Sequence, residues 1–230
     1  MTMIQTQLQT VRDRITAACL AAGRAPDAVA LLAVSKTFDA QAVAEAHAAG
    51  QTAFGENYIQ EAVQKITALR HLPLQWHCIG PIQSNKTRLV AEHFDWVHTV
   101  DRLKVAQRLS EQRPAGLPPL QVCLQVNVDG GGTKSGVLPH EALALARQVA
   151  TLPHLQLRGI MSIPEPAPDF VAACALFARV KTVFDALNGA GLALDTLSMG
   201  MSADMEAAIH AGSTLVRVGT AIFGGRPRPV

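Results

Sequence analysis

The stretch Leu31-Leu32-Ala33-Val34-Ser35-Lys36-Thr37 organises the interpretation of the whole chain. Its apolar residues are typical of a buried strand, and they stop abruptly at a serine, a lysine and a threonine. An ammonium group at the end of a buried strand loses water, which favours the neutral amine and makes Lys36 a candidate Schiff-base nucleophile. The alternative is a lysine whose charged end reaches solvent, and this stretch alone leaves both interpretations open.

The composition of the 230 residues argues against several classes of protein. Hydrophobic residues make up 49% and charged residues 17%, which indicates a folded globular chain. The formal net charge of +2, without a basic cluster that alternates with aromatic residues, argues against nucleic-acid binding. Because no apolar run could span a bilayer and residues 1–9 lack an apolar signal core, we expect a cytoplasmic protein without membrane attachment.

The cysteines and potential metal ligands show no chemical pattern. Four cysteines are scattered along the chain at Cys19, Cys78, Cys123 and Cys174, with no C-x-x-C spacing. They are expected to be reduced and buried, as small hydrophobic residues of a cytosolic protein. No cluster of carboxylates, histidines or cysteines has metal-ligand spacing, so no metal site is predicted.

Strands and helices alternate along most of the chain. An amphipathic helix is predicted at about residues 4–22, and a barrel at about residues 29–225. Strands are expected at residues 29–34, 52–54, 74–79, 95–99, 120–128, 155–163, 196–199 and 215–218. Helices are expected between them at residues 40–49, 58–69, 84–93, 103–112, 139–152, 170–188 and 203–211.

This alternation predicts an α/β fold with about eight β-then-α units. Apolar strands of the doubly covered parallel type, in a chain of this length, favour a (β/α)8 barrel of the TIM type with an extra N-terminal helix. No linker marks a second domain, so residues 1–230 are expected to form one domain. A doubly wound open sheet is the alternative, because a count of alternating units does not establish closure.

A barrel of this type collects its functional residues at the carboxyl ends of its strands. The predicted ends carry Ser35-Lys36-Thr37, Gly55-Glu56-Asn57, His77, Thr99, Asp101, Asn127, Met161-Ser162, Ser198-Met199-Gly200-Met201-Ser202 and Arg217-Val218-Gly219-Thr220. Nearly every strand therefore ends in small or polar groups suited to a ligand site.

The last two strand ends favour an anion. Ser202 is expected to cap the following helix, and Gly200 allows a ligand to approach the backbone closely. Gly219 and Thr220 add donors after the last strand, where barrel enzymes often hold phosphate. Lys36 faces this predicted phosphate site across the barrel mouth, which suits pyridoxal 5′-phosphate (PLP), a phosphorylated aldehyde, held as an imine.

Long motifs in this order resemble the pyridoxal phosphate homeostasis protein family, a PLP-binding barrel related to the N-terminal domain of alanine racemase. The motifs are Ala33-Val34-Ser35-Lys36-Thr37, Phe54-Gly55-Glu56-Asn57-Tyr58-x-Gln60-Glu61, Trp76-His77-x-Ile79-Gly80-Pro81-x-Gln83-Ser84-Asn85-Lys86, Lys134-Ser135-Gly136, Gly159-x-Met161-x-Ile163-Pro164, Ser198-Met199-Gly200-Met201-Ser202-x-Asp204-Met205-Glu206-Ala207-Ala208-Ile209 and Gly212-Ser213-Thr214-x-Val216-Arg217-x-Gly219-Thr220-Ala221-Ile222-Phe223-Gly224. The resemblance covers most of the chain between Leu31 and Gly225.

The resemblance implies a set of cofactor-binding residues. Lys36 would hold PLP as a Schiff base, Asn57 would lie near its ring, and Arg217 would face its pyridine nitrogen. The phosphate would be held by Ser202, Gly219 and Thr220, with Met201 also in the site. Secondary candidates are His77, Ser162 and Lys134, and Lys134 matches a family lysine linked to cofactor transfer or occupancy. Phe38 departs from the family, since many relatives carry a lysine there.

The residues favour a carrier of PLP over an enzyme. Racemisation needs a base on each face of the substrate, and the only tyrosine of the chain, Tyr58, opens a predicted helix. An arginine at the pyridine nitrogen keeps its proton, which makes the ring a weak electron sink. We therefore expect a monomeric protein of PLP homeostasis and delivery, with apo PLP-dependent enzymes as acceptors. A single-domain amino-acid racemase or related PLP enzyme is the main alternative, and a barrel phosphatase or aldolase that uses Lys36 is the third.

Overall fold

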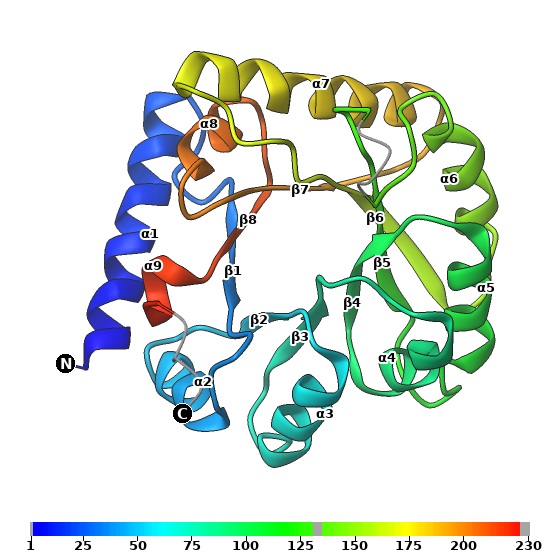
Figure 1. The fold of residues 1–230 in the computed structure, drawn as a ribbon, viewed down its shortest axis with the longest axis horizontal. Coiled ribbons are helices and arrows are strands. Elements are labelled where there is room, and N and C mark those ends of the chain that lie inside the picture. Colours follow the sequence, from blue (N-terminus) through cyan, green and yellow to red (C-terminus); the bar gives the residue numbers. More distant parts are fainter. Residues whose placement is uncertain (1, 131–134, 226–230) are drawn as a thin grey trace.

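The N-terminal helix has strong local signals at its start. In the computed structural model, which describes residues 2–130 and 135–225, α1 runs over Met3–Ala21. Thr2 and Gln5 form a reciprocal capping box at its N-terminus. One face of α1, made of Leu8, Val11, Ile15 and Cys19, is buried against the outside of the barrel. α1 packs against α8 and α9, beside the last strands (Figure 1).

Eight parallel strands close into a barrel at the centre of the molecule (Figure 1). They are β1 (Ala30–Val34), β2 (Ala53–Glu56), β3 (Gln75–Cys78), β4 (Trp96–Val100), β5 (Leu120–Gln125), β6 (Leu155–Met161), β7 (Thr196–Met201) and β8 (Leu215–Val218). The pairing of β1 with β8, with Leu32 opposite Arg217, completes the ring. The closed barrel with its N-terminal helix confirms the predicted fold class and rules out the open sheet.

Helices surround the strands as the outer layer. They are α2 (Ala40–Ala48), α3 (Ile59–Ala68), α4 (Thr87–His93), α5 (Leu103–Gln112), α6 (Ala142–Ala150), α7 (Phe170–Gly189), α8 (Met205–His210) and α9 (Thr220–Phe223), with a short 3₁₀ helix η1 (Ser84–Lys86) before α4. The main apolar core fills the space between this layer and the strands. Two smaller clusters lie apart from it: one contains Leu32, Val34, Ile79 and Leu215, and the other Trp96, Cys123 and Met161. None of the described helices is long and apolar enough to cross a membrane.

The element boundaries differ from the predicted ones in three informative places. β7 continues to Met201, and α8 begins only at Met205, because a hydrogen-bonded turn separates them. The helix predicted at residues 139–152 begins at Ala142. A four-residue helix, α9, follows β8 directly and was absent from the predicted elements, because its sequence is too short to show helical periodicity.

Candidate functional site

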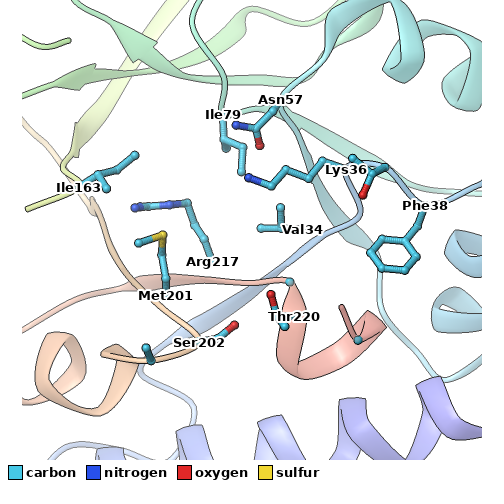
Figure 2. Close-up of a pocket in the computed structure, with 14 residues that line it drawn as sticks. Val34, Lys36, Phe38, Asn57, Ile79, Ile163, Met201, Ser202, Arg217 and Thr220 are labelled. Carbon is cyan, nitrogen blue, oxygen red and sulfur yellow. The ribbon is translucent and has the colours of Figure 1, made fainter. Parts of the chain in front are cut away.

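A cavity of about 320 Å³ opens at the carboxyl ends of the strands (Figure 2). Its walls come from the loops after β1, β2, β3, β6, β7 and β8. The lining residues are Val34, Lys36, Thr37, Phe38, Asn57, Ile79, Ile163, Met201, Ser202, Ala203, Arg217, Gly219, Thr220 and Gly224. All seven residues of the primary predicted site are among them, so the fold brings together residues that are up to 184 positions apart, from Lys36 to Thr220. Their contacts with a cofactor remain predictions.

The lysine side of the cavity combines an amine with buried polar atoms. Figure 2 shows the Lys36 side chain reaching inward, with Nζ near Asn57 and Ile79. The Asn57 Oδ1 and Thr37 Oγ1 atoms are buried and have no hydrogen-bond partner among the described residues. Buried polar atoms are normally satisfied, so these two atoms indicate a place for a ligand or water.

The opposite side of the cavity is built from small residues and backbone. Ser202 and Thr220 lie here, with Thr220 at the start of α9 (Figure 2). Gly219, which directly precedes Thr220, also lines the cavity. A Cβ atom added at Gly219 would lie 3.1 Å from the Val34 carbonyl oxygen, so this position has little room for a side chain. In α9 the N–H groups of Ile222 and Phe223 donate to the Gly219 carbonyl. The N–H groups of Thr220 and Ala221 precede the first turn and have no acceptor within the helix. This side therefore offers main-chain donors where the lysine side offers an amine.

The turn between β7 and α8 corrects the expected role of Ser202. The N-cap residue of α8 is Asp204, and Ser202 lies two residues earlier in the turn. The Asp204 carboxylate accepts a hydrogen bond of 2.6 Å from the Met201 backbone N–H, so it stabilises the turn. Ser202 is therefore not a helix cap. Gly200 adopts a φ of +96° before this turn, and a Cβ there would lie 2.5 Å from Ala208 Cβ.

Arg217 lies on the cavity wall, and its guanidinium is held by hydrogen bonds to β7 and to the residue after β6. One terminal nitrogen donates to Ser198 Oγ at 2.8 Å, and the other donates to the Ser162 carbonyl at 3.0 Å. Arg217 is only 4% exposed, and burial lowers its pKa to about 10, partly offset by Asp204. It therefore stays protonated at neutral pH and can only donate hydrogen bonds.

A chain of buried hydrogen bonds continues from Arg217 through the barrel interior. Ser198 Oγ lies 2.9 Å from His98 Nδ1, His98 Nε2 lies 2.9 Å from His77 Nδ1, and His77 Nε2 lies 3.0 Å from Gln75 Oε1. With both histidines neutral, the donors run from Arg217 towards Gln75 and each ring carries its proton on Nε2, because the guanidinium can only donate and the amide oxygen can only accept.

The surroundings of the two histidines agree with their neutral state. Burial lowers the pKa of His77 to about 3. The pKa of His98 is also well below its ordinary value, first because of burial and then because of His77 and Arg217. Trp96 stacks on His77 with a centroid distance of 5.2 Å and completes the apolar surroundings.

The three secondary candidates are placed differently from the primary set. His77 is in the barrel interior and does not line the cavity. Ser162 is buried and does not line the cavity. The Ser162 hydroxyl donates to the Val126 carbonyl, and the Ser162 carbonyl accepts from Arg217. Lys134 lies outside the described residues. His77 and Ser162 thus reach the cavity only through Arg217.

Sequence reasoning missed part of the cavity and most of its support. Ile163 and Ile79 line the cavity but carry no chemical signal of their own. Phe38, where many relatives carry a lysine, lies on the wall and packs against Phe223 of α9 with a centroid distance of 5.2 Å. His98 sits mid-strand in β4, where only its partner on β7 reveals its role.

Metal and thiol chemistry find no support in the described part of the chain. Among the residues 2–130 and 135–225, no group of three or more histidines, cysteines or acidic residues is arranged to hold a metal ion. All four cysteines are free thiols. Burial raises the pKa of Cys78 and Cys123 to about 12, which keeps both protonated and unreactive.

Comparison with known proteins gives consistent matches along the chain. The family model for the alanine racemase N-terminal domain matches residues 7–227. A pyridoxal phosphate homeostasis protein of Pseudomonas aeruginosa is 62% identical over 226 residues, which are 98% of this chain and 97% of that protein.

Solved structures extend the comparison to a cofactor complex and to an enzyme. PipY of Synechococcus elongatus, with PLP bound, is 39% identical with a TM-score of 0.84, covering 96% of this chain and 100% of that one. Alanine racemase from Corynebacterium glutamicum matches with a TM-score of 0.68 at 19% identity, over 96% of this chain and 62% of the racemase. The likeness to the racemase concerns the fold alone.

Proposed function

This chain belongs to the pyridoxal phosphate homeostasis protein family, and we propose that it binds PLP as a Schiff base on Lys36 and acts in PLP homeostasis and delivery. The observation that carries the proposal is the convergence of an amine, a buried guanidinium and main-chain donors on one cavity of about 320 Å³. Cavities of about 300 Å³ and above are the usual size for small cofactors. PipY, which covers 96% of this chain, has PLP bound in its structure.

The residues of the cavity fit the chemistry of PLP. Lys36 supplies a primary amine, which condenses with an aldehyde to form an imine and release water. Asn57 and Thr37 supply buried oxygen atoms that have no partner among the described residues and that suit polar substituents of a ring. Ser202, Gly219 and Thr220 suit the phosphate, since they combine a hydroxyl, close backbone approach and N–H groups. PLP, when bound, supplies an electron-accepting ring.

Arg217 supports carriage of PLP over enzymatic use of it. A protonated ring nitrogen makes the pyridine a strong electron sink, and an acidic partner is needed to stabilise that proton. Arg217 remains a cation at neutral pH and donates, so it favours an unprotonated ring nitrogen. We therefore propose that Lys36 is a tether, and that substrate carbanions receive little stabilisation in this site.

The remaining expectations follow from this role. We propose that residues 1–230 act as one PLP-binding domain, as a monomer in the cytoplasm. Acceptors of the cofactor would be apo PLP-dependent enzymes. Neither a nucleic acid nor a membrane is part of the proposed function.

The attachment of PLP is tested by spectroscopy and mass mapping. Purified protein is incubated with PLP, its absorbance is recorded, and the imine is reduced with borohydride before peptide mapping. We expect imine absorbance and a reduced adduct on Lys36, both lost in Lys36→Met. Lys181→Met, at a partly exposed position on α7, is the matched control and should retain both. An adduct on other lysines, with none on Lys36, would contradict the proposal.

The choice between carrier and enzyme needs a separate measurement. The PLP-loaded protein is incubated with L-amino acids in deuterated water, and deuterium at Cα is followed by mass spectrometry. We expect incorporation no faster than with free PLP. Sustained exchange at enzymatic rates, abolished by Lys36→Met, would favour the single-domain racemase or a related PLP enzyme instead.

A further inference from the structure

The loop that carries Lys36 is attached to a buried cluster of charges behind the cavity. The cluster consists of Glu56 at the end of β2 and of Glu61 and Lys65 on successive turns of α3. Lys65 Nζ lies 2.7 Å from Glu56 Oε1 and 2.7 Å from Glu61 Oε1. The side chains of Glu56 and Lys65 are 0% and 5% exposed, and that of Glu61 is 34% exposed.

Both peptide groups that flank the Cα atom of Lys36 end on this cluster. The Ser35 carbonyl, on the N-terminal side, accepts a hydrogen bond of 2.8 Å from Lys65 Nζ. The Thr37 N–H, on the C-terminal side, donates to Glu61 Oε1 at 2.8 Å. The Ser35 hydroxyl adds a third connection, a 2.6 Å hydrogen bond to Glu56 Oε1. The backbone of Lys36 is thus held on both sides by one set of ionic groups.

Thr37 has an unfavourable backbone conformation that its surroundings must stabilise. Its φ of +68° is in the left-handed region, which residues other than glycine rarely adopt. An unusual backbone conformation persists only where its surroundings enforce it, and such positions gather at functional sites. Two bonds enforce it: the Phe38 N–H donates to the Ser35 carbonyl at 3.1 Å and closes the turn, and the Thr37 N–H donates to Glu61. The bond to Glu61 also ties the chain that leaves Lys36 to α3.

We propose that Glu56, Glu61 and Lys65 are positioning residues that hold the backbone of Lys36 so that its amine reaches the aldehyde of the cofactor. The proposal rests on the proposed function, since it assigns a role in PLP attachment. It assigns the cluster no contact with PLP itself. We call these three residues, with their bonds to the Ser35 carbonyl and the Thr37 N–H, the clamp. Loss of the clamp should slow the attachment of PLP to Lys36 and leave the phosphate side of the cavity intact.

A pair of substitutions at Glu61 isolates the hydrogen bond to Thr37. Glu61→Gln keeps an oxygen acceptor, whereas Glu61→Leu removes it, and the partial exposure of Glu61 makes both variants compatible with folding. Gln60→Leu, on the same helix but exposed, is the control for adding a leucine. We expect imine formation with PLP to slow about tenfold in Glu61→Leu, because this variant loses a bond to a charged acceptor. In Glu61→Gln it should slow less than about threefold, because a neutral hydrogen bond to Thr37 remains.

Two further measurements distinguish positioning from general damage. Affinity for pyridoxine 5′-phosphate, which lacks the aldehyde, should be the same in wild type and all three variants. Hydrogen exchange of the Thr37 amide in cofactor-free protein should accelerate about tenfold in Glu61→Leu, with little change in Glu61→Gln. Because this exchange needs no cofactor, it tests the clamp even if wild-type protein formed no adduct on Lys36, a result that would count against the proposed function alone.

The outcomes that would overturn the clamp are distinct. Equal slowing in both Glu61 variants would assign the effect to charge and not to the bond with Thr37. An equal fall in pyridoxine 5′-phosphate affinity would show damage to the whole cavity. An unchanged rate of hydrogen exchange at the Thr37 amide in Glu61→Leu would show that the bond to Glu61 does not restrain the Thr37 backbone. Lys65→Met should slow imine formation more than Glu61→Leu does, since it removes the bond from Lys65 to the Ser35 carbonyl and leaves that carbonyl only its 3.1 Å bond from the Phe38 N–H.

Discussion

The two sides of the cavity are held in place by opposite means. On the lysine side, charged side chains fix the backbone around Lys36, with Lys65 at the centre of three contacts within 2.8 Å. On the opposite side, the absence of side chains matters, because Gly200 lets the end of β7 lie close to Ala208 of α8, and Gly219 lets the chain after β8 lie close to Val34 of β1. Removing a charge should therefore damage the first side, and adding a carbon atom should damage the second.

This difference matches what each side is proposed to hold. A covalent bond needs one atom in one position, and a rigid clamp on the backbone of Lys36 provides it. A phosphate needs several donors around it, and main-chain N–H groups provide them without long side chains. Arg217 lies between the two sides. It is held in a third way, by a chain of hydrogen bonds through the uncharged side chains of Ser198 and His98.

The largest effect should come from breaking the clamp at its centre. Lys65→Met leaves the Glu56 carboxylate buried without its cation, which should lower the free energy of unfolding by about 3–5 kcal/mol. Urea unfolding followed by circular dichroism measures this loss. The double variant Lys65→Met/Glu56→Gln removes the buried charge as well and should recover part of the stability. A double variant as unstable as the sum of the single variants would argue against the coupling.

A smaller loss should follow from one added methyl group on the opposite side. Gly200→Ala meets Ala208 Cβ and also needs a φ of +96°, which together should cost about 2 kcal/mol. The affinity for pyridoxine 5′-phosphate should fall as well, because the turn before Ser202 must shift. Calorimetry measures both effects. Gly189→Ala, with no heavy atom within 4 Å of the new Cβ, is the control that should keep stability and affinity.

The chain below Arg217 should make the protein sensitive to acid. The pKa of His77 is lowered to about 3 in the folded state, so the unfolded state binds the extra proton between about pH 6.5 and pH 3. Stability should therefore fall as the pH drops through this window, by about 2 kcal/mol at pH 5 for His77 alone. Urea unfolding at pH 5 and pH 7 measures the fall.

His77→Gln should weaken this pH dependence, and His140→Asn, at an exposed position, should leave it unchanged. A His77→Gln variant with the full wild-type dependence would show that His77 is not held neutral. His98 contributes in the same direction, since its pKa is also lowered, and it should account for much of the dependence that remains.

The smallest predicted effect has the opposite sign and belongs to the clamp. Burial raises the pKa of Glu56, partly offset by Lys65 and Ser35, so the folded state binds this proton more tightly than the unfolded state. The contribution of Glu56 to stability is therefore present below about pH 4.5 and is lost as the pH rises through its folded-state pKa. Comparing wild type with Glu56→Gln between pH 4 and pH 7 isolates it. A stability difference that moves the other way would contradict the raised pKa.

Much of the architecture could be predicted from the chain alone. All eight strands lie where apolar runs predicted them, because each is a short apolar segment that ends in polar or small residues. Some ends differ from the prediction: β5 and β6 end two or three residues earlier, and β7 ends two residues later. α8 begins two residues later than predicted, since Asp204 and not Ser202 occupies the cap position. The cavity residues Lys36, Asn57, Ser202 and Thr220 were found because strand ends of a barrel meet at one face.

The supporting residues could not be found in this way. Glu61 and Lys65 have ordinary helical spacing, and nothing in the sequence shows that they face the peptide groups of Lys36. His98 and Ser198 are 100 positions apart, and their hydrogen bond exists only because β4 and β7 both point these residues into the barrel.

The sequence by itself determined the number of β-then-α units, the lysine just after the first strand, and the glycines at the ends of the last two strands. These are local properties, set by hydrophobic pattern and by backbone freedom. Only the tertiary structure decided that the sheet closes, that Arg217 is held by a neutral chain, and that one ionic cluster clamps both sides of Lys36. Those features depend on contacts between distant segments, whose charges acquire their strength only when the fold removes them from water.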